Sequence, residues 1–163
     1  MLNVRYSLIL PALLVAVSMF AVACGGDDDA SGTNAEVAGA SGQKEIPLTA
    51  PDDAIATGSG LKFYDIKEGA GVEPTANQSV VVNYKGMLTD GTVFDSSYDR
   101  GAAATFPLNG VIPGFAEGIS TMKVGGHRVL YIPSELGYGA QGYPPVIPAN
   151  ANLIFEVELI EIR

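Results

Sequence analysis

An alternating apolar run from Val80 to Leu88, closed by Asp90-Gly91, constrains the fold of this chain more than any other feature. Val80, Val82 and Tyr84 share one face of an extended chain, because successive side chains of a strand point to opposite faces. An Asp-Gly pair after such a run is a strong signal for a hairpin turn, and the residues after it resume as a strand. We therefore expect an antiparallel hairpin that offers one apolar face to a core.

The segments around this hairpin predict further strands and a single helix. Additional strands are expected at residues 61–66, 103–108, 127–132 and 153–162, the last with Glu156 on a wet face. A helical pattern opens at residue 113, in which Phe115, Ile119 and Met122 form one apolar stripe, and Gly125-Gly126 is expected to end it. Five or six strands and one short helix predict an α+β fold, with a curled antiparallel sheet packed over the helix around one core.

The composition narrows the chemistry available to the chain. A formal net charge of -9 argues against nucleic-acid binding, which needs a basic patch. A zinc site lacks ligands, because the single His127 and the single Cys24 lie far apart in the sequence, and we interpret His127 as an ordinary surface residue. Residues 137–142 (GYGAQG) fit the dinucleotide pattern G-x-G-x-x-G. Tyr143-Pro144-Pro145 follows, and its prolines prevent the helix that such a site requires, so we expect a tight loop.

The first 24 residues have the pattern of an export signal. Arg5 gives a positive start, residues 6–22 are an apolar run that is short for a bilayer span, and small residues precede Cys24. The end of the run resembles the lipobox of a bacterial lipoprotein, with Ala21 where Leu is usual. The resemblance implies that residues 1–23 are a signal peptide, and that a lipidated Cys24 anchors the exported chain to the bacterial membrane with its domain outside the cytoplasm. The alternative is a free Cys24 thiol near the end of an uncleaved membrane anchor.

Residues 24–56 are predicted to be a flexible acidic tether. They are rich in Gly, Ala, Ser and Thr, carry seven acidic residues against Lys44 alone, and show no apolar periodicity. We interpret them as a solvated spacer that holds the next domain away from an anionic surface, with a cation site at the acidic run 27–29 as the alternative. The composition changes near Thr57, so the folded domain is expected to span residues 57–163.

Aromatic and aliphatic residues gather in or near the predicted loops of that domain. They are Tyr84, Phe94, Val111, Ile112, Phe115, Tyr138, Tyr143, Val146, Ile147 and Phe155. Each could belong to the core, but together they could line an apolar cleft in which tyrosine hydroxyls remain as donors. Asp95, directly after Phe94, places a carboxylate at the end of a strand, and from the pattern alone a surface turn residue is an equally good interpretation.

Three sequence blocks resemble a known family. VVVNYKGMLTDGTVFDSS, GVIPGFAEGISTMKVGG and GYGAQGYPPVIPANANLIFEVEL are similar to the signature blocks of FKBP-type peptidyl-prolyl isomerases, in the same order, over roughly residues 57–163. The resemblance implies a curled sheet over a short helix, and isomerisation of X-Pro bonds without a metal or other cofactor. It also implies proline-containing unfolded or partly folded proteins as substrates and macrolides such as rapamycin as inhibitors. We expect a monomer that binds no nucleic acid.

The pocket residues of the family carry over position by position. The resemblance implies catalytic roles for Tyr84, Phe94, Asp95, Ile112, Tyr138 and Phe155, and substrate binding by Arg100, Val111, Phe115, Tyr143, Val146 and Ile147. Asp95 would be a buried wall group held by Arg100 and the Tyr84 hydroxyl, rather than a base. Phe115 stands where the family commonly has Trp, Ala104 where an aromatic residue is frequent, and Tyr143 where some members have His.

Two functions remain open from the sequence. An enzyme of this kind would accelerate the folding of envelope or secreted proteins, because uncatalysed isomerisation takes about 10–100 s. An FKBP-like chaperone or docking module with little turnover would use the same groove, and the departures at Phe115 and Ala104 keep this alternative open. A purely structural surface lipoprotein has only the tether in its support.

Overall fold

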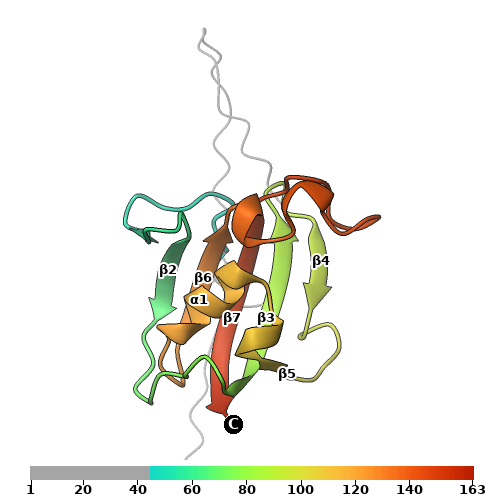
Figure 1. Ribbon diagram of the computed structural model, residues 1–163. Helices are drawn as coiled ribbons and strands as arrows, with labels where there is room; N and C mark the ends of the chain where they lie inside the picture. The colour runs from blue at the N-terminus through green and yellow to red at the C-terminus, as the bar shows by residue number, and fades with distance from the viewer. Residues whose placement is uncertain (1–44) are drawn as a thin grey trace, which may run out of the picture. The chain divides into compact units, whose positions relative to one another are not determined.

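The computed structural model describes residues 45–163, which contain one antiparallel sheet and one short α-helix (Figure 1). The strands are β1 (Ile55–Ala56), β2 (Lys62–Lys67), β3 (Ser79–Leu88), β4 (Val93–Ser96), β5 (Ala104–Pro107), β6 (His127–Ile132) and β7 (Leu153–Ile162). Their order in the sheet is β1-β2-β6-β7-β3-β4, and β5 also pairs with β3. The predicted signal peptide, Cys24 and residues 24–44 of the predicted tether lie outside the described residues.

The two ten-residue strands β3 and β7 pair along their whole length. Their register runs from Val80 opposite Ile162 to Leu88 opposite Leu153, with one irregularity after Val81. On its other edge β3 pairs with β4, which confirms the hairpin predicted at Asp90-Gly91. The strands expected at 61–66, 103–108, 127–132 and 153–162 correspond to β2, β5, β6 and β7. Strand β1 was not expected, because two residues are too few to show an alternating pattern.

Helix α1 (Pro113–Ser120) packs against one face of the sheet and contacts β6 (Figure 1). Phe115 and Ile119 are buried on its inner side, as the apolar stripe predicted. Close approach depends on Gly118, because a Cβ atom at this position would lie only 2.4 Å from Cδ2 of Leu130. The expected end of the helix at Gly125-Gly126 is wrong, since Thr121 already forms the C-cap and the chain leaves the helical conformation there.

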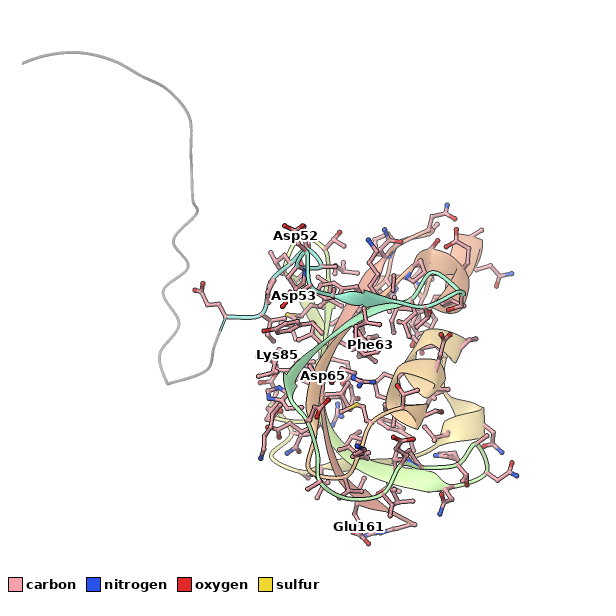
Figure 2. The ribbon with its side chains drawn as sticks, turned by 90° about the vertical axis from the view of Figure 1, so that its left-hand side faces the viewer. Asp52, Asp53, Phe63, Asp65, Lys85 and Glu161 are labelled. Atoms are coloured by element: carbon pink, nitrogen blue, oxygen red, sulfur yellow. The ribbon has the colours of Figure 1, made fainter. Side chains whose placement is uncertain are left out.

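Arg128 ties the sheet to the end of this helix. Its guanidinium binds the Asp65 carboxylate through Nε at 2.6 Å and Nη2 at 2.9 Å, and Nη1 donates to the Gly118 carbonyl oxygen and to the Thr121 hydroxyl. The same guanidinium lies 4.0 Å from the ring centroid of Phe63, which occupies the space between sheet and helix (Figure 2). A buried cation is tolerated here because its donors are paired.

The core fills the space between α1 and the sheet. Its buried members include Leu61, Val80, Val82, Leu130, Ile132, Leu153, Val157 and Leu159. Three short 3-10 helices lie in the connections: η1 (Leu108–Gly110), η2 (Ser134–Leu136) and η3 (Gly139–Gln141). Within residues 45–163, no helix has the length and apolar character needed to cross a bilayer.

A second, smaller apolar cluster packs separately from this core. Its buried residues are Met87, Val129 and Ile154. Ile46 packs against this cluster from the segment before β1, and the Tyr131 hydroxyl donates to the Pro47 carbonyl oxygen at 3.0 Å. The segment that carries Asp52 and Asp53 then leads into β1, which pairs with β2 (Figure 2).

Ile46, Pro47 and strand β1 therefore contact the sheet, although they precede residue 57, where the folded domain was expected to begin. The pattern did not show this because Ile46, Leu48 and Ile55 are isolated apolar residues in a polar stretch. A single apolar residue that packs onto an existing sheet leaves no periodicity in the sequence.

The predicted wet position of Glu156 is also wrong. Its side chain is buried, with Oε1 2.9 Å from Nε2 of His127 and Oε2 3.9 Å from Nζ of Lys85. Oε2 has no hydrogen-bond partner among residues 45–163. His127 is accordingly not an ordinary surface residue, because 22 % of its side chain is exposed and its ring nitrogen Nε2 forms a hydrogen bond with the Glu156 carboxylate.

We expect Ile46→Ala to lower the free energy of unfolding by about 1 kcal/mol, because part of this side chain leaves water when it packs on the sheet. The matched control is Val72→Ala, at a side chain that is 73 % exposed, for which a change within about 0.5 kcal/mol is expected. Denaturant unfolding of the full chain measures both. Equal stability of the two variants would show that the segment before β1 contributes nothing to the fold.

Candidate active site

An apolar cleft of about 320 Å³ is formed by segments that lie far apart in the sequence. Its lining comes from β3, β4, β5, β7, α1 and the loops beside them: Tyr84, Phe94, Asp95, Phe106, Gly110, Val111, Ile112, Phe115, Tyr138 and Phe155. All of these except Phe106 and Gly110 are residues that the sequence predicted for the site. The fold therefore brings most of the predicted residues together in one place.

Aromatic rings form the floor and walls of the cleft. The ring of Phe115 packs edge-to-face against Phe155 at a centroid distance of 5.2 Å, and Phe94 packs against the same Phe155 at 5.6 Å. Phe106 contacts both Phe115 and Tyr84, so β5 supplies an aromatic wall two residues beyond Ala104. Edge-to-face pairs are favoured because the positive edge of one ring meets the negative face of the next. Together these rings give the cleft an apolar surface.

Gly86 of β3 makes room for two of these rings. A Cβ atom at this position would lie 2.7 Å from Cε2 of Phe94 and 3.0 Å from Cε1 of Phe155. Any larger residue would push the rings away from the strand and change the shape of the cleft. Sequence reasoning assigned no role to Gly86, since a glycine in a strand shows its purpose only when its neighbours in space are known.

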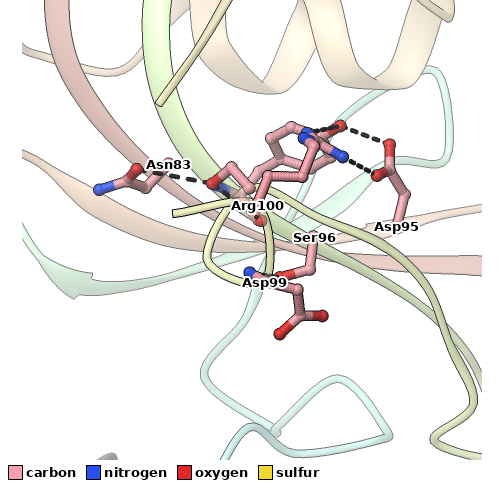
Figure 3. A network of polar contacts seen from close by, with 7 residues as sticks. Asn83, Asp95, Ser96, Asp99 and Arg100 are labelled. Atoms are coloured by element: carbon pink, nitrogen blue, oxygen red, sulfur yellow. Dashed lines mark hydrogen bonds and ion pairs between the residues drawn. The ribbon is translucent and has the colours of Figure 1, made fainter. Parts of the chain in front are cut away.

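The polar side of the cleft is one connected network (Figure 3). The Tyr84 hydroxyl donates to Oδ2 of Asp95, Nη1 of Arg100 donates to Oδ1 of Asp95, and Nη2 of Arg100 donates to the Tyr84 oxygen at 2.8 Å. These are the partners predicted for Asp95. The prediction that this carboxylate is buried is wrong, because 44 % of its side chain is exposed. Asp95 and Arg100 thus lie at the mouth of the cleft.

Opposing effects set the pKa values of this network. Partial burial raises the pKa of the Asp95 carboxyl, but hydrogen bonds from Tyr84 and Arg100, with the Arg100 charge, hold that pKa below its ordinary value. Burial and the hydrogen bond to Asp95 raise the pKa of the Tyr84 hydroxyl. Asp95 is therefore ionised and Tyr84 neutral at neutral pH, so neither group is poised to exchange a proton there.

Two donors at the cleft have no acceptor within residues 45–163, namely the Tyr138 hydroxyl and the Ile112 backbone N–H. Burial, followed by the negative charge of Asp95, raises the pKa of Tyr138 and keeps its hydroxyl protonated. Ile112 is the N-cap of α1, and its carbonyl oxygen accepts hydrogen bonds from Phe115 and Ala116 while its N–H stays outside the helix. Carbonyl oxygens of a bound polypeptide can accept hydrogen bonds from both donors.

Four of the predicted residues do not line the cleft. Arg100 lies at its mouth, bound to Asp95. The ring of Tyr143 packs beside Tyr138 at a centroid distance of 5.8 Å and is 62 % exposed, and Val146 is exposed as well. Ile147 is buried in the core, so its place is to support the loop rather than to contact a ligand.

Other parts of the described chain offer weaker candidates for a site. A smaller cleft of about 170 Å³ beside Asp65 and Arg128 has a charged lining, but these two side chains already bind each other. His127 is paired with Glu156 and lines no part of the aromatic cleft. Among residues 45–163 no cluster of His, Cys, Asp and Glu is arranged to hold a metal ion.

Comparison with known proteins identifies the family to which the chain is similar. The sequence profile of the FKBP-type peptidyl-prolyl cis-trans isomerases matches residues 71–160. The chain is 48 % identical over 123 residues to the FKBP-type peptidyl-prolyl cis-trans isomerase FkpA of Aeromonas hydrophila, covering 75 % of this chain and 46 % of the relative. It is 50 % identical over 105 residues to the peptidyl-prolyl cis-trans isomerase Mip of Coxiella burnetii, covering 64 % and 46 %. The chain thus spans about half the length of these curated relatives.

Solved structures show the same fold. The crystal structure of FkpA from Escherichia coli matches with a TM-score of 0.67 and 44 % identity, covering 69 % of this chain and 53 % of that one. A peptidyl-prolyl cis-trans isomerase from Pseudomonas syringae matches with a TM-score of 0.65 and 34 % identity, covering 69 % and 83 %. With the profile match over most of the described residues and the aromatic cleft in place, the chain belongs to the FKBP-type peptidyl-prolyl cis-trans isomerase family.

Proposed function

We propose that the chain catalyses cis-trans isomerisation of X-Pro bonds in unfolded or partly folded proteins. The observation that carries this proposal is the cleft itself, in which an aromatic floor at Phe94, Phe115 and Phe155 lies beside a neutral donor at Tyr138. Its volume of about 320 Å³ falls at the small end of the range for ligand clefts, about 300–1,000 Å³. That size suits a proline ring with its neighbouring peptide groups.

The chemistry requires only that the cleft bind the twisted amide better than the planar one. Rotation of an X-Pro bond crosses a barrier of about 18–20 kcal/mol because resonance holds the amide planar. In the twisted transition state the nitrogen loses conjugation and the amide becomes less polar, so dry aromatic walls favour it over the planar ground state. A ten-thousandfold acceleration corresponds to about 5.4 kcal/mol of such preferential binding. No bond breaks, and no nucleophile, metal or cofactor is required.

The polar groups of the cleft hold the substrate in one orientation. The Tyr138 hydroxyl and the Ile112 N–H donate to carbonyl oxygens on either side of the rotating bond. Asp95 acts as an oriented wall group, because both of its oxygens are bound by Tyr84 and Arg100 and it is not available as a base. Positioning of this kind contributes by removing orientations that do not lead to the transition state.

A chaperone or docking role is the second candidate, and one observation favours it. Tyr143 and Val146 expose apolar surface beside Tyr138 at the edge of the cleft. Exposed apolar surface next to a cleft is suited to binding unfolded segments. Turnover of a short X-Pro peptide by the full chain separates the two functions, since only the enzyme accelerates isomerisation. A macrolide such as rapamycin is expected to compete with that peptide for the cleft.

The N-terminal sequence supports a proposal on where in the cell the chain acts. We propose that residues 1–23 direct export, that a lipid on Cys24 anchors the chain to the membrane, and that the domain acts outside the cytoplasm on envelope or secreted proteins. The support is the apolar run that ends at small residues directly before Cys24.

Tyr138→Phe is expected to lower kcat/KM about two- to thirteenfold, because it removes one neutral hydrogen bond to the transition state, worth about 0.5–1.5 kcal/mol. Tyr131→Phe is the matched control. The hydroxyl that it removes donates to the Pro47 carbonyl oxygen, and Tyr131 does not line the cleft. Protease-coupled or NMR exchange measurements on an X-Pro peptide give both values. Equal activity of the two variants would remove Tyr138 from the mechanism.

Turnover is expected to be constant between about pH 6 and 8 and to fall at acidic pH. Because the pKa of Asp95 is lowered in the folded state, its contribution to stability is present above the unfolded value of about 3.9 and is lost as the pH falls through the folded value. Protonation then releases Arg100 and Tyr84. A pH–rate profile of the wild type and of Asp95→Asn measures this. A steep change between pH 6 and 8, or inactivation by His127→Ala with the fold intact, would mean that a general acid or base takes part.

Cys24→Ala is expected to release the chain from the membrane fraction or to leave an unprocessed precursor. Mass spectrometry of the membrane-bound wild type should show a chain that starts at Cys24 and carries lipid. A mature chain that starts at another residue would contradict the proposed anchor without affecting the proposed catalysis.

A further inference from the structure

Strands β4 and β5 pair with the same edge of β3 and leave a gap between them. β4 occupies that edge from Lys85 to Met87, and β5 occupies it from Ser79 to Val82. Tyr84, whose hydroxyl belongs to the site, lies at the gap between the two pairings. The chain that connects β4 to β5 over this gap is loop 97–103, which carries Arg100.

Ser97, the first residue of this loop, lies in the gap between the two pairings. It is fully buried, its N–H donates to the Tyr84 carbonyl oxygen at 2.9 Å, and its hydroxyl oxygen accepts from the Tyr84 N–H at 2.8 Å. The same hydroxyl lies within donating distance of two acceptors, with Oγ 3.3 Å from the Tyr84 carbonyl oxygen and 3.5 Å from Oδ1 of Asn83 (Figure 3). Ser97 therefore satisfies both main-chain groups of Tyr84 that the gap would otherwise leave unpaired in a buried position.

The same residue closes the loop. The Ser97 carbonyl oxygen accepts from the Ala102 N–H at 3.3 Å, and the Tyr98 carbonyl oxygen accepts from the Gly101 N–H at 3.0 Å. Gly101 has a φ of 67°, a conformation that glycine adopts without steric cost. Residues 97–102 thus form a closed turn whose first residue is fixed to β3.

Tyr98 holds the loop from the opposite face of the sheet. Since Tyr84 faces the cleft, its neighbours Asn83 and Lys85 face away from it. The Tyr98 ring lies 6.0 Å from Nζ of Lys85, and Asn83 donates to the Glu158 carboxylate at 3.3 Å. Burial raises the pKa of Tyr98, and the charge of Glu158 with a hydrogen bond to it raises that pKa further. Tyr98 is thus packed among groups on the face away from the cleft.

We propose that Ser97 and Tyr98 are positioning residues of the isomerase site, which hold loop 97–103 across β3 so that the Arg100 guanidinium stays on Asp95 and the Tyr84 hydroxyl. Neither residue belongs to the lining of the cleft. Arg100 is half exposed, and a long exposed side chain keeps one geometry only if its backbone is fixed. The catalytic part of this inference rests on the proposed function, whereas the fixing of Asp95 does not.

The experiment compares two variants of the loop with two controls in the full chain. Ser97→Ala removes the buried hydroxyl, and Tyr98→Phe removes only a hydroxyl while keeping the ring. Ser120→Ala deletes a serine hydroxyl that donates to the Ala116 carbonyl oxygen in α1, and Val129→Ala lowers stability at the second apolar cluster. For each variant, turnover of an X-Pro peptide and the pKa of the Asp95 carboxyl, by carbon-13 NMR titration, are measured below the unfolding temperature.

We expect Ser97→Ala to reduce kcat/KM about tenfold, which corresponds to about 1.4 kcal/mol, and to shift the Asp95 pKa upward toward its ordinary value. Tyr98→Phe should shift both quantities in the same direction by a smaller amount, and it decides the question if Ser97→Ala does not fold. Both controls should keep the wild-type Asp95 pKa and turnover. Wild-type values in both loop variants, or an equal loss in Val129→Ala, would overturn the inference. A wild type without turnover would refute the proposed function, and the Asp95 titration would still test the positioning role.

Discussion

The site depends on the pairing of β3 with β7. These strands are each ten residues long, and their register sets Gly86 opposite Phe155 and Tyr84 opposite Val157. A slip of one residue would turn Tyr84 to the other face of the sheet, because the side-chain period of a strand is two. The register is fixed since both strands bury apolar residues against α1, and β7 also buries Ile154 in the second cluster. The other elements that line the cleft are positioned relative to this pair of strands.

The cleft separates two physical tasks. In the mechanism that we propose, its aromatic part excludes water and supplies the preference for a twisted amide, which depends on contact area and shape. Its polar part, with Asp95 and Arg100 half exposed, contributes little to stability because solvent screens exposed ion pairs. The role that we assign to the network is therefore to fix the orientation of the Asp95 carboxylate. Its rigidity comes from backbone contacts behind it, where Ser97 binds the main chain of Tyr84.

The sequence predicted the strands and the helix that have a clear period, and the family resemblance placed Tyr84, Phe94, Asp95 and Phe155 in one site. Prediction from the sequence was wrong or silent where the place of a residue is decided by its neighbours in space. Ile46 packs on the sheet without any periodic pattern, and Glu156 is buried on a face that its alternation predicted to be wet. Gly86 and Ser97 carry no signal of their own, because their roles follow from the rings above the strand and from the gap between β4 and β5.

The central claim is that the cleft accelerates rotation of an X-Pro bond by differential binding, with no proton transferred in the rate-limiting step. The most direct test is the catalysed rate on an X-Pro peptide, measured for the full chain in H₂O and in D₂O at matched acidity. The account predicts the same rate in both solvents, because Asp95 stays ionised and the hydroxyls of Tyr84 and Tyr138 only donate hydrogen bonds. A clearly slower rate in D₂O would show that a proton is transferred in the transition state and would contradict the account.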